Sequence, residues 1–312
     1  MLRVRIGEKR PARRARRGEG GAASGRRGEG GYTPAVPAQA IAQNLAYINW
    51  TVLVALAVGS FAAVVLGRLR TTATRGYLAF TAFCAGGFAI LAWLSDTALP
   101  AAIADSHVVP DASYELPRRL AIAALAILAF AYMVVVARGR RTPLIGVAGL
   151  VAGAAALVFG ALSWGGDLMG AIPLLIQLAV LSGATGGVFA AMILGHWYLV
   201  TPKLSEVPLV LFARLLLWIV GLQVVLFVAW LATGAGIGAG PFEPLVGPWA
   251  LFVWLRLIVG LIFPLIVSWA ALQTARTRSM ESATGLLYIN VGSIAAGTIL
   301  ASGLYFGAGL LT

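Results

Sequence analysis

Eight long apolar stretches constrain the fold of this chain more than any other feature of its 312 residues. Each is about as long as the roughly 20 residues that an α-helix needs to cross the hydrocarbon core of a bilayer. They lie at 45–67, 76–98, 118–137, 143–163, 171–200, 208–232, 249–274 and 283–310. The pattern predicts an all-α fold, a polytopic integral membrane helix bundle of about eight transmembrane helices that occupies residues 41–312.

The segment before the first apolar stretch has a different composition. Residues 1–31 carry ten Lys and Arg and three Glu, which is +7 of the formal net charge of +12. An Arg- and Gly-rich segment with few apolar residues cannot bury enough surface to offset its chain entropy. We therefore expect residues 1–40 to be a disordered basic tail, either adhering to anionic headgroups or simply solvated. The tail lacks the short apolar core of a signal peptide.

The loop charges predict the orientation of the helices, because cytoplasmic loops are enriched in Lys and Arg. The odd-numbered loops carry Arg68, Arg70, Arg75, Arg138, Arg140, Arg141, Lys203, Arg276 and Arg278. The even-numbered loops and their margins are mainly acidic, with Asp96, Asp105, Asp111, Glu115, Asp167 and Glu243. This distribution predicts a multi-pass protein of the inner (plasma) membrane with its odd-numbered loops in the cytoplasm. The basic tail would then lie outside, which conflicts with its charge.

Polar side chains recur at one depth in the last four apolar stretches. His196 and Arg214 lie about four and six residues from the predicted cytoplasmic ends of their helices, so about 6 to 9 Å below the surface at 1.5 Å per residue. The full candidate set is His196, Tyr198, Arg214, Gln273, Tyr288 and Asn290. Polar groups at this depth are costly in lipid and frequently functional, so we expect these six residues to form a ligand-binding layer.

Arg214 adds the only fixed charge to this layer. An arginine is always protonated and needs a carboxylate, phosphate or carbonyl partner, yet no acidic residue lies at matching depth within the helices. Glu206 and Glu281 are the nearest candidates. If neither reaches Arg214, a lipid headgroup, a quinone oxygen or a haem propionate becomes the expected partner. The alternative is that Arg214 extends to the surface and His196 bonds a backbone carbonyl.

These residues favour a quinone over a haem as the cofactor. A haem needs axial ligands, and His196 has no second histidine near it, because His107 lies in an opposite-side loop. A quinone needs only one or two donors, such as His196 or Tyr288. We therefore predict a quinone-binding membrane subunit of a redox complex. A transporter or lipid-handling protein, and a structural or assembly subunit, are the alternative interpretations.

The remaining chemistry-bearing residues predict no self-contained enzyme. Two histidines and one cysteine on separate segments do not form a nucleophilic triad or a zinc site, so no metal site is predicted. The expected partners are the lipid bilayer and other membrane subunits, with no nucleic acid. On the even-loop side, Arg256 is expected to take part in charge pairing between helices. Its predicted neighbours are Glu243, Asp167, Arg118 and Arg119.

Two short motifs carry a resemblance to other proteins. The first is Gly195–Pro202, GHWYLVTP, and the second is SATGLLYI at 282–289. In these segments the chain resembles a group of uncharacterised bacterial multi-helix membrane proteins, over approximately the last four apolar stretches. The resemblance implies the same architecture and draws attention to His196 and Tyr288, and it implies no activity.

Overall fold

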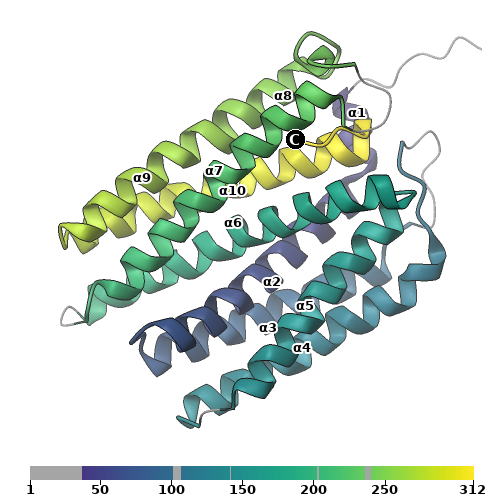
Figure 1. Cartoon of the computed structure of the whole chain (residues 1–312). Coiled ribbons are helices and arrows are strands. Elements are labelled where there is room, and N and C mark those ends of the chain that lie inside the picture. The colour runs from purple at the N-terminus through teal and green to yellow at the C-terminus, as the bar shows by residue number, and fades with distance from the viewer. Residues whose placement is uncertain (1–36, 101–106, 141, 202–203, 236–239) are drawn as a thin grey trace, which may run out of the picture. The chain divides into compact units, whose positions relative to one another are not determined.

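The computed structural model describes residues 37–100, 107–140, 142–201, 204–235 and 240–312. Within these ranges the chain is a bundle of α-helices, and eight helical segments are long and apolar enough to cross a membrane (Figure 1). The predicted all-α membrane bundle is therefore confirmed. Residues 1–36 of the predicted tail lie outside the described residues.

The helices follow the predicted stretches closely. In chain order they are α1 (Pro37–Gln43), α2 (Leu45–Arg70), α3 (Arg75–Thr97), α4 (Glu115–Ala137), α5 (Pro143–Trp164), α6 (Leu168–Val200), α7 (Val207–Thr233), α8 (Ala250–Leu257), α9 (Phe263–Arg276) and α10 (Met280–Ala308). Short α1 includes residues 37–40, which the sequence assigned to the tail. Pro37 fits the first position of a helix, where no backbone N–H is needed, and Ala40 is buried.

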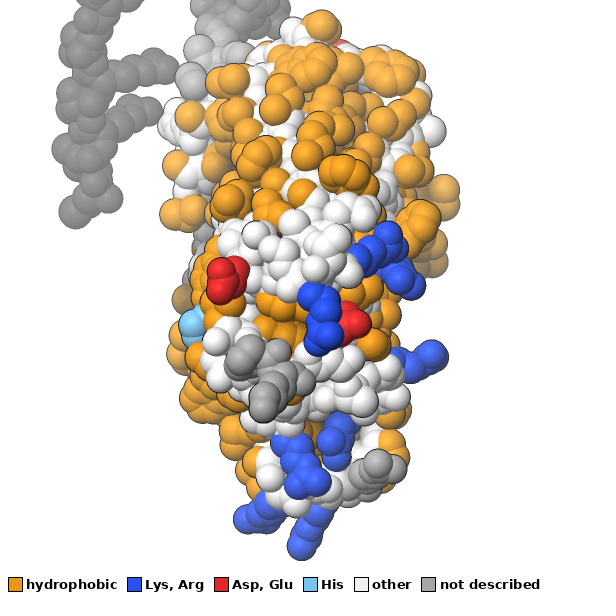
Figure 2. Space-filling view, turned by 90° about the vertical axis from the view of Figure 1, so that its left-hand side faces the viewer, with side chains coloured by type: hydrophobic (Ala, Val, Ile, Leu, Met, Phe, Trp, Pro, Cys, Tyr) orange, Lys and Arg blue, Asp and Glu red, His pale blue; other side chains and the backbone are white. Residues whose placement is uncertain are grey.

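Successive spans run in opposite directions, so the loops alternate between the two ends of the bundle. We call the end that holds the α2–α3, α4–α5, α6–α7 and α9–α10 connections the basic end. Its described Arg side chains gather on the surface that faces the viewer in Figure 2. The other end, with the α3–α4, α5–α6 and α7–α8 connections, is called the opposite end. The assignment of the basic end to the cytoplasm stays a prediction.

Helix α6 packs against both halves of the bundle. It contacts α2 and α5 on one side and α7 and α10 on the other (Figure 1). A Cβ atom on Gly59 of α2 would lie 1.8 Å from the carbonyl oxygen of Ser182, and one on Gly186 would lie 2.2 Å from the backbone nitrogen of Ser60. Small residues thus let the two helix backbones touch. Close packing of this kind stabilises helix pairs in lipid, where the hydrophobic effect no longer drives their association.

The seventh span, Ala250–Arg276, is interrupted near its middle. Helices α8 and α9 are joined by a π-helical turn, Ile258–Ile262, just before Pro264. Proline lacks the backbone N–H that an α-helix needs, and a π-turn is one way to accommodate the lost hydrogen bond. At this turn Gly260 packs directly on α10, because a Cβ atom there would lie 2.6 Å from the Cα atom of Gly297.

Candidate functional site

The structure brings His196 and Tyr288 together. The Tyr288 hydroxyl lies 3.4 Å from Nδ1 of His196, across the contact between α6 and α10. The helices approach closely here, since a Cβ atom on Gly195 would lie 2.7 Å from the Thr284 hydroxyl oxygen. Both His196 and Tyr288 are exposed on the surface of the bundle. The pair therefore presents polar groups outward rather than into an enclosed cavity.

Tyr198 and Gln273 lie apart from that pair. Tyr198 is buried, and its hydroxyl donates to the backbone carbonyl of Ser205. This bond ties the end of α6 to the start of α7, so the hydroxyl already has a partner. The Gln273 side chain is partly buried on α9 and makes no hydrogen bond with a described residue.

Asn290 faces the interior, between α9 and α10. Its side chain is fully buried and donates from Nδ2 to the Ser268 hydroxyl at 2.8 Å. Its Oδ1 accepts from the Ser293 hydroxyl at 3.3 Å. These contacts satisfy the amide and hold the two helices together, which is a structural role.

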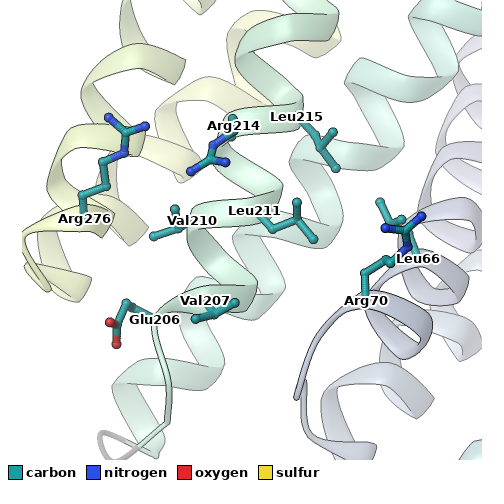
Figure 3. A pocket seen from close by; sticks show the side chains of 9 residues that line it. All are labelled: Leu66, Arg70, Glu206, Val207, Val210, Leu211, Arg214, Leu215 and Arg276. Atoms are coloured by element: carbon teal, nitrogen blue, oxygen red, sulfur yellow. The ribbon is translucent and has the colours of Figure 1, made fainter.

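Arg214 lines a different hollow, which we call the α7 groove. Its volume is about 670 Å³, and it is lined by Leu66, Arg70, Glu206, Val207, Val210, Leu211, Arg214, Leu215 and Arg276. Arg214, Arg276 and Glu206 lie toward one side of α7, while Arg70 and Leu66 lie toward the other (Figure 3). Leu211 and Leu215 lie between them. The groove therefore combines guanidinium groups at its margins with an apolar floor.

The three arginines of the α7 groove have no carboxylate partner. Among the described residues, Arg70, Arg214 and Arg276 form no ion pair, whereas Glu206 pairs with Arg278 at 3.4 Å. Neither Glu206 nor Glu281, the two candidates from the sequence, is paired with Arg214. The groove thus carries uncompensated positive charge.

One side-chain contact links α7 to α2. Pro208 occupies the first turn of α7, where a missing N–H is tolerated. Phe212, one turn later, is buried against Gly67 of α2, where a Cβ atom would lie 3.2 Å from the ring. A side chain at Gly67 would therefore press against the Phe212 ring.

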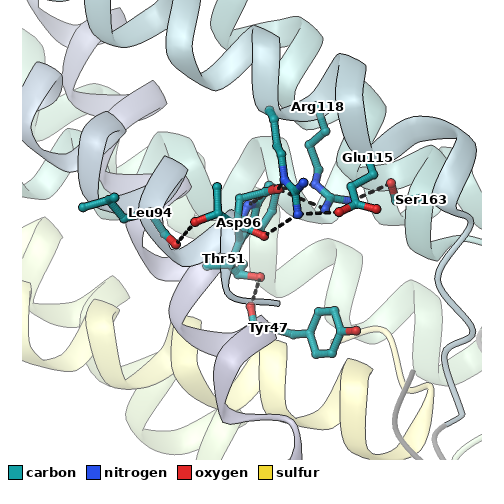
Figure 4. A network of polar contacts seen from close by, with 10 residues as sticks. Tyr47, Thr51, Leu94, Asp96, Glu115, Arg118 and Ser163 are labelled. Carbon is teal, nitrogen blue, oxygen red and sulfur yellow. Dashed lines mark hydrogen bonds and ion pairs between the residues drawn. The ribbon is translucent and has the colours of Figure 1, made fainter. Parts of the chain in front are cut away.

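The opposite end holds charges of a different kind. Asp96 is completely buried and accepts from Nε of Arg118 at 2.6 Å, from Nε of Arg119 at 2.9 Å and from the Trp50 indole at 2.7 Å (Figure 4). Arg118 also donates to the Ser163 hydroxyl at 2.7 Å. We call these five residues the Asp96 cluster. It links α2, α3, α4 and α5, and Arg119 also forms an ion pair with Glu115, so its charges are compensated within the protein.

The expected charge pairing of Arg256 is wrong, because Arg256 forms no ion pair among the described residues. Arg256 is buried, and its guanidinium donates to the Gln223 side-chain oxygen at 2.8 Å and to the Gly260 carbonyl at 3.0 Å. Its Nε has no hydrogen-bond partner in the described part of the chain. The expected acidic partners have other contacts. Glu243 accepts a hydrogen bond from the backbone nitrogen of Gly240 at 2.7 Å, and Asp167 accepts one from the backbone nitrogen of Gly170 at 2.9 Å.

The predicted six-residue layer is therefore divided among separate places. His196 and Tyr288 meet on the surface, Asn290 is buried, Tyr198 closes a turn, and Arg214 lines the α7 groove. The sequence reasoning missed Arg70 and Arg276 as neighbours of Arg214. Both were counted as loop charges, and an even spread of apolar residues around α7 gave no sign of the direction in which Arg214 points.

Within the described ranges, no group of three or more His, Cys, Asp or Glu side chains could hold a metal ion. Comparisons with protein-family models, with curated proteins and with solved structures found no match. The resemblance carried by the two motifs therefore stays a prediction, and the geometry of the site is the basis for assigning a function.

Proposed function

We propose that this integral membrane protein binds an anionic amphiphile in the α7 groove at its basic end. The observation that carries the proposal is the set of three unpaired guanidiniums, Arg70, Arg214 and Arg276, around one hollow. Guanidinium groups form paired hydrogen bonds with phosphate and carboxylate oxygens, which supports an anionic headgroup as the ligand. Of the interpretations open from the sequence, this is the lipid-handling one.

The floor of the groove supports an amphiphile over a small soluble anion. Leu66, Leu211 and Leu215 line it, and an acyl chain laid on them would remain in contact with apolar surface. The volume of about 670 Å³ lies within the usual range for ligand pockets. Basic pockets at the cytoplasmic ends of membrane helices commonly hold anionic headgroups, in agreement with the predicted orientation.

Native mass spectrometry of the purified full chain tests this proposal. The protein is incubated in detergent with equal amounts of phosphatidylglycerol and phosphatidylcholine of the same acyl composition. We expect preferential retention of phosphatidylglycerol, and we expect Arg214→Gln to lower that preference about fivefold, since one arginine near a headgroup contributes about 1 kcal/mol. Arg214→Gln with Arg276→Gln should abolish it.

Arg138→Gln is the matched control. Arg138 is an exposed arginine at the same end of the bundle and does not line the groove. Its replacement removes the same charge and should leave the preference unchanged. Equal retention of both lipids by the wild-type protein, or an equal loss in Arg138→Gln and Arg214→Gln, would contradict the proposal.

One observation favours quinone binding as a second candidate function. His196 and Tyr288 form an exposed pair of hydrogen-bonding groups on adjacent helices, and a quinone carbonyl arriving from the bilayer could accept a hydrogen bond from either group. Redox chemistry would then come from a partner subunit. Solvent extraction of the purified protein should yield a bound quinone, and His196→Ala should lose it. If the extract contains no quinone, this second candidate is ruled out.

A further inference from the structure

A second hollow at the basic end has a different chemistry from the α7 groove. It lies between the α2–α3 loop and the α4–α5 connection and has a volume of about 670 Å³. Its polar lining comprises Arg68, Arg75, Arg140, Thr71, Thr72, Thr74, Thr142 and Tyr132. We call it the threonine hollow. It shares no lining residue with the α7 groove.

The charge of the threonine hollow is uniformly positive. No acidic residue lines it, and among the described residues Arg68, Arg75 and Arg140 form no ion pair. Gly139 makes room for one of these arginines, because a Cβ atom there would lie 2.5 Å from Nη1 of Arg75. Gly139 also has a φ of +69°, a backbone conformation that favours glycine. The turn after α4 is thus shaped to bring the Arg75 guanidinium beside it.

Two hydroxyl groups in the lining have no hydrogen-bond partner among the described residues. The Thr142 hydroxyl oxygen is buried without a hydrogen bond. The Tyr132 hydroxyl also makes no hydrogen bond with a described residue, but its oxygen keeps some contact with solvent. Buried polar groups are normally satisfied, so an unpaired one calls for a ligand or ordered water. Here the unpaired hydroxyls line the same hollow as three guanidiniums.

The other threonines hold the shape of the loop. The Thr71 hydroxyl donates to the Gly67 carbonyl at 2.7 Å and accepts from the Ala73 nitrogen at 3.2 Å. The Thr74 hydroxyl accepts from the Tyr77 nitrogen at 3.4 Å, so its own proton is free to be donated. Hydrogen bonds within the α2–α3 loop therefore fix its shape. The hollow beside it offers both hydroxyl and guanidinium donors.

We propose that the threonine hollow binds the phosphate group of a phosphomonoester or of free phosphate. A tetrahedral oxyanion accepts several charge-assisted hydrogen bonds at once, which matches three arginines and at least two free hydroxyls. Leu69 and Pro143 are the largest apolar residues of the lining, so it offers little surface for an acyl chain. The lining lies mainly at the helix ends and in the loops, where a water-soluble ligand has access.

Titration of the full chain with inorganic phosphate in detergent and phosphate-free buffer is the first arm of the test. The second arm measures retention of phosphatidic acid against phosphatidylcholine of the same acyl composition by native mass spectrometry. Binding of inorganic phosphate identifies a soluble source of the group. Retention of phosphatidic acid that Arg140→Gln lowers, without binding of inorganic phosphate, identifies a lipid headgroup as the source. Either result supports the site if the variants below respond as expected.

Arg140→Gln and Arg68→Gln should each weaken binding about tenfold, because each removes hydrogen bonds to a charged group. Thr142→Val should weaken it less. Arg138→Gln is the control for charge at this end in both arms, and it should bind as the wild type does. Arg214→Gln is the control for the α7 groove in the first arm, where it should bind inorganic phosphate as the wild type does. Thermal midpoints equal to that of the wild type establish that the variants fold. Absence of binding in both arms, or an equal effect of Arg138→Gln and Arg140→Gln, would overturn the proposal.

Discussion

The two ends of this bundle use arginine in opposite ways. At the opposite end, Arg118 and Arg119 surround the buried Asp96 carboxylate, and four helices are joined through it. At the basic end, the arginines of the α7 groove and the threonine hollow form no ion pair with any described residue. A charge that is satisfied inside the protein stabilises the fold, and a charge left unpaired beside a hollow is available to a ligand.

The difference has an energetic basis. A buried ion pair is costly to assemble, yet removing one partner leaves an uncompensated charge and commonly costs about 3–5 kcal/mol. An exposed arginine contributes little to the free energy of unfolding, so its replacement changes the stability of the fold little. The comparison therefore predicts that substitutions at the Asp96 cluster reduce stability, while those in the α7 groove reduce binding.

The largest effect should come from Asp96→Ala. The change leaves Arg118 buried beside Trp50 and Trp164 without its carboxylate, so the free energy of unfolding should fall by about 3–5 kcal/mol. Denaturation in detergent, followed by circular dichroism, measures the loss. Asp96→Asn should lie between Ala and wild type, because its amide oxygen still accepts a hydrogen bond. A loss below about 1 kcal/mol in Asp96→Ala would show that the cluster is not a structural link.

An intermediate effect is expected for Gln223→Leu. Arg256 would lose its one side-chain acceptor and keep the Gly260 carbonyl. A buried donor left unsatisfied costs about 1–3 kcal/mol, so the loss of stability should be smaller than in Asp96→Ala. The same denaturation measurement checks the order of the two variants. A larger loss of stability in Gln223→Leu than in Asp96→Ala would mean that the contacts of Arg256 stabilise the bundle more than the Asp96 cluster does.

Arg214→Gln and Arg276→Gln should change the free energy of unfolding by less than about 0.5 kcal/mol, as surface substitutions usually do. Neither arginine has an ion pair to lose among the described residues. The variants should be measured without added lipid, because a ligand that binds the folded state raises apparent stability. A loss comparable to that of Gln223→Leu would indicate that these arginines have structural partners.

The smallest effect on stability is expected for Val210→Glu. This variant also tests most directly whether an arginine must be unpaired to bind a ligand. The new carboxylate would lie one helical turn before Arg214 and line the same groove. Such a pair four residues apart stabilises a helix by about 0.2–0.5 kcal/mol, and it should remove the preference for phosphatidylglycerol. Val210→Gln is the matched control without a charge. If Val210→Glu keeps the preference, the unpaired state of Arg214 is not what attracts the lipid.

The architecture could be read from the sequence because span length and apolarity suffice to predict membrane helices. All eight predicted stretches correspond to observed spans, with differences of a few residues at their ends. Helix α6 begins at Leu168 rather than 171 because Asp167 caps it by accepting from the Gly170 nitrogen. Glu115 begins α4 before the predicted 118, since Pro117 is tolerated in a first turn.

The site was harder to predict than the fold. Counting residues along a helix gives the depth of a side chain in the membrane, but it does not give the direction in which that side chain points. Arg214 and His196 lie near the predicted end of the bundle, yet one lines the α7 groove and the other faces outward beside Tyr288. In soluble proteins a polar face tells which side of a helix is exposed, whereas a helix that is apolar all round gives no such reference. Asp96 illustrates the same limit, since it was counted among loop charges and is fully buried.

An experimental structure of the full chain in nanodiscs that contain phosphatidylglycerol is the most direct test of the central claim. The account predicts headgroup density within hydrogen-bond distance of the Arg214 guanidinium, with an acyl chain along Leu211 and Leu215. Density for a neutral lipid alone, or an Arg214 side chain paired with Glu206 across a closed groove, would contradict it.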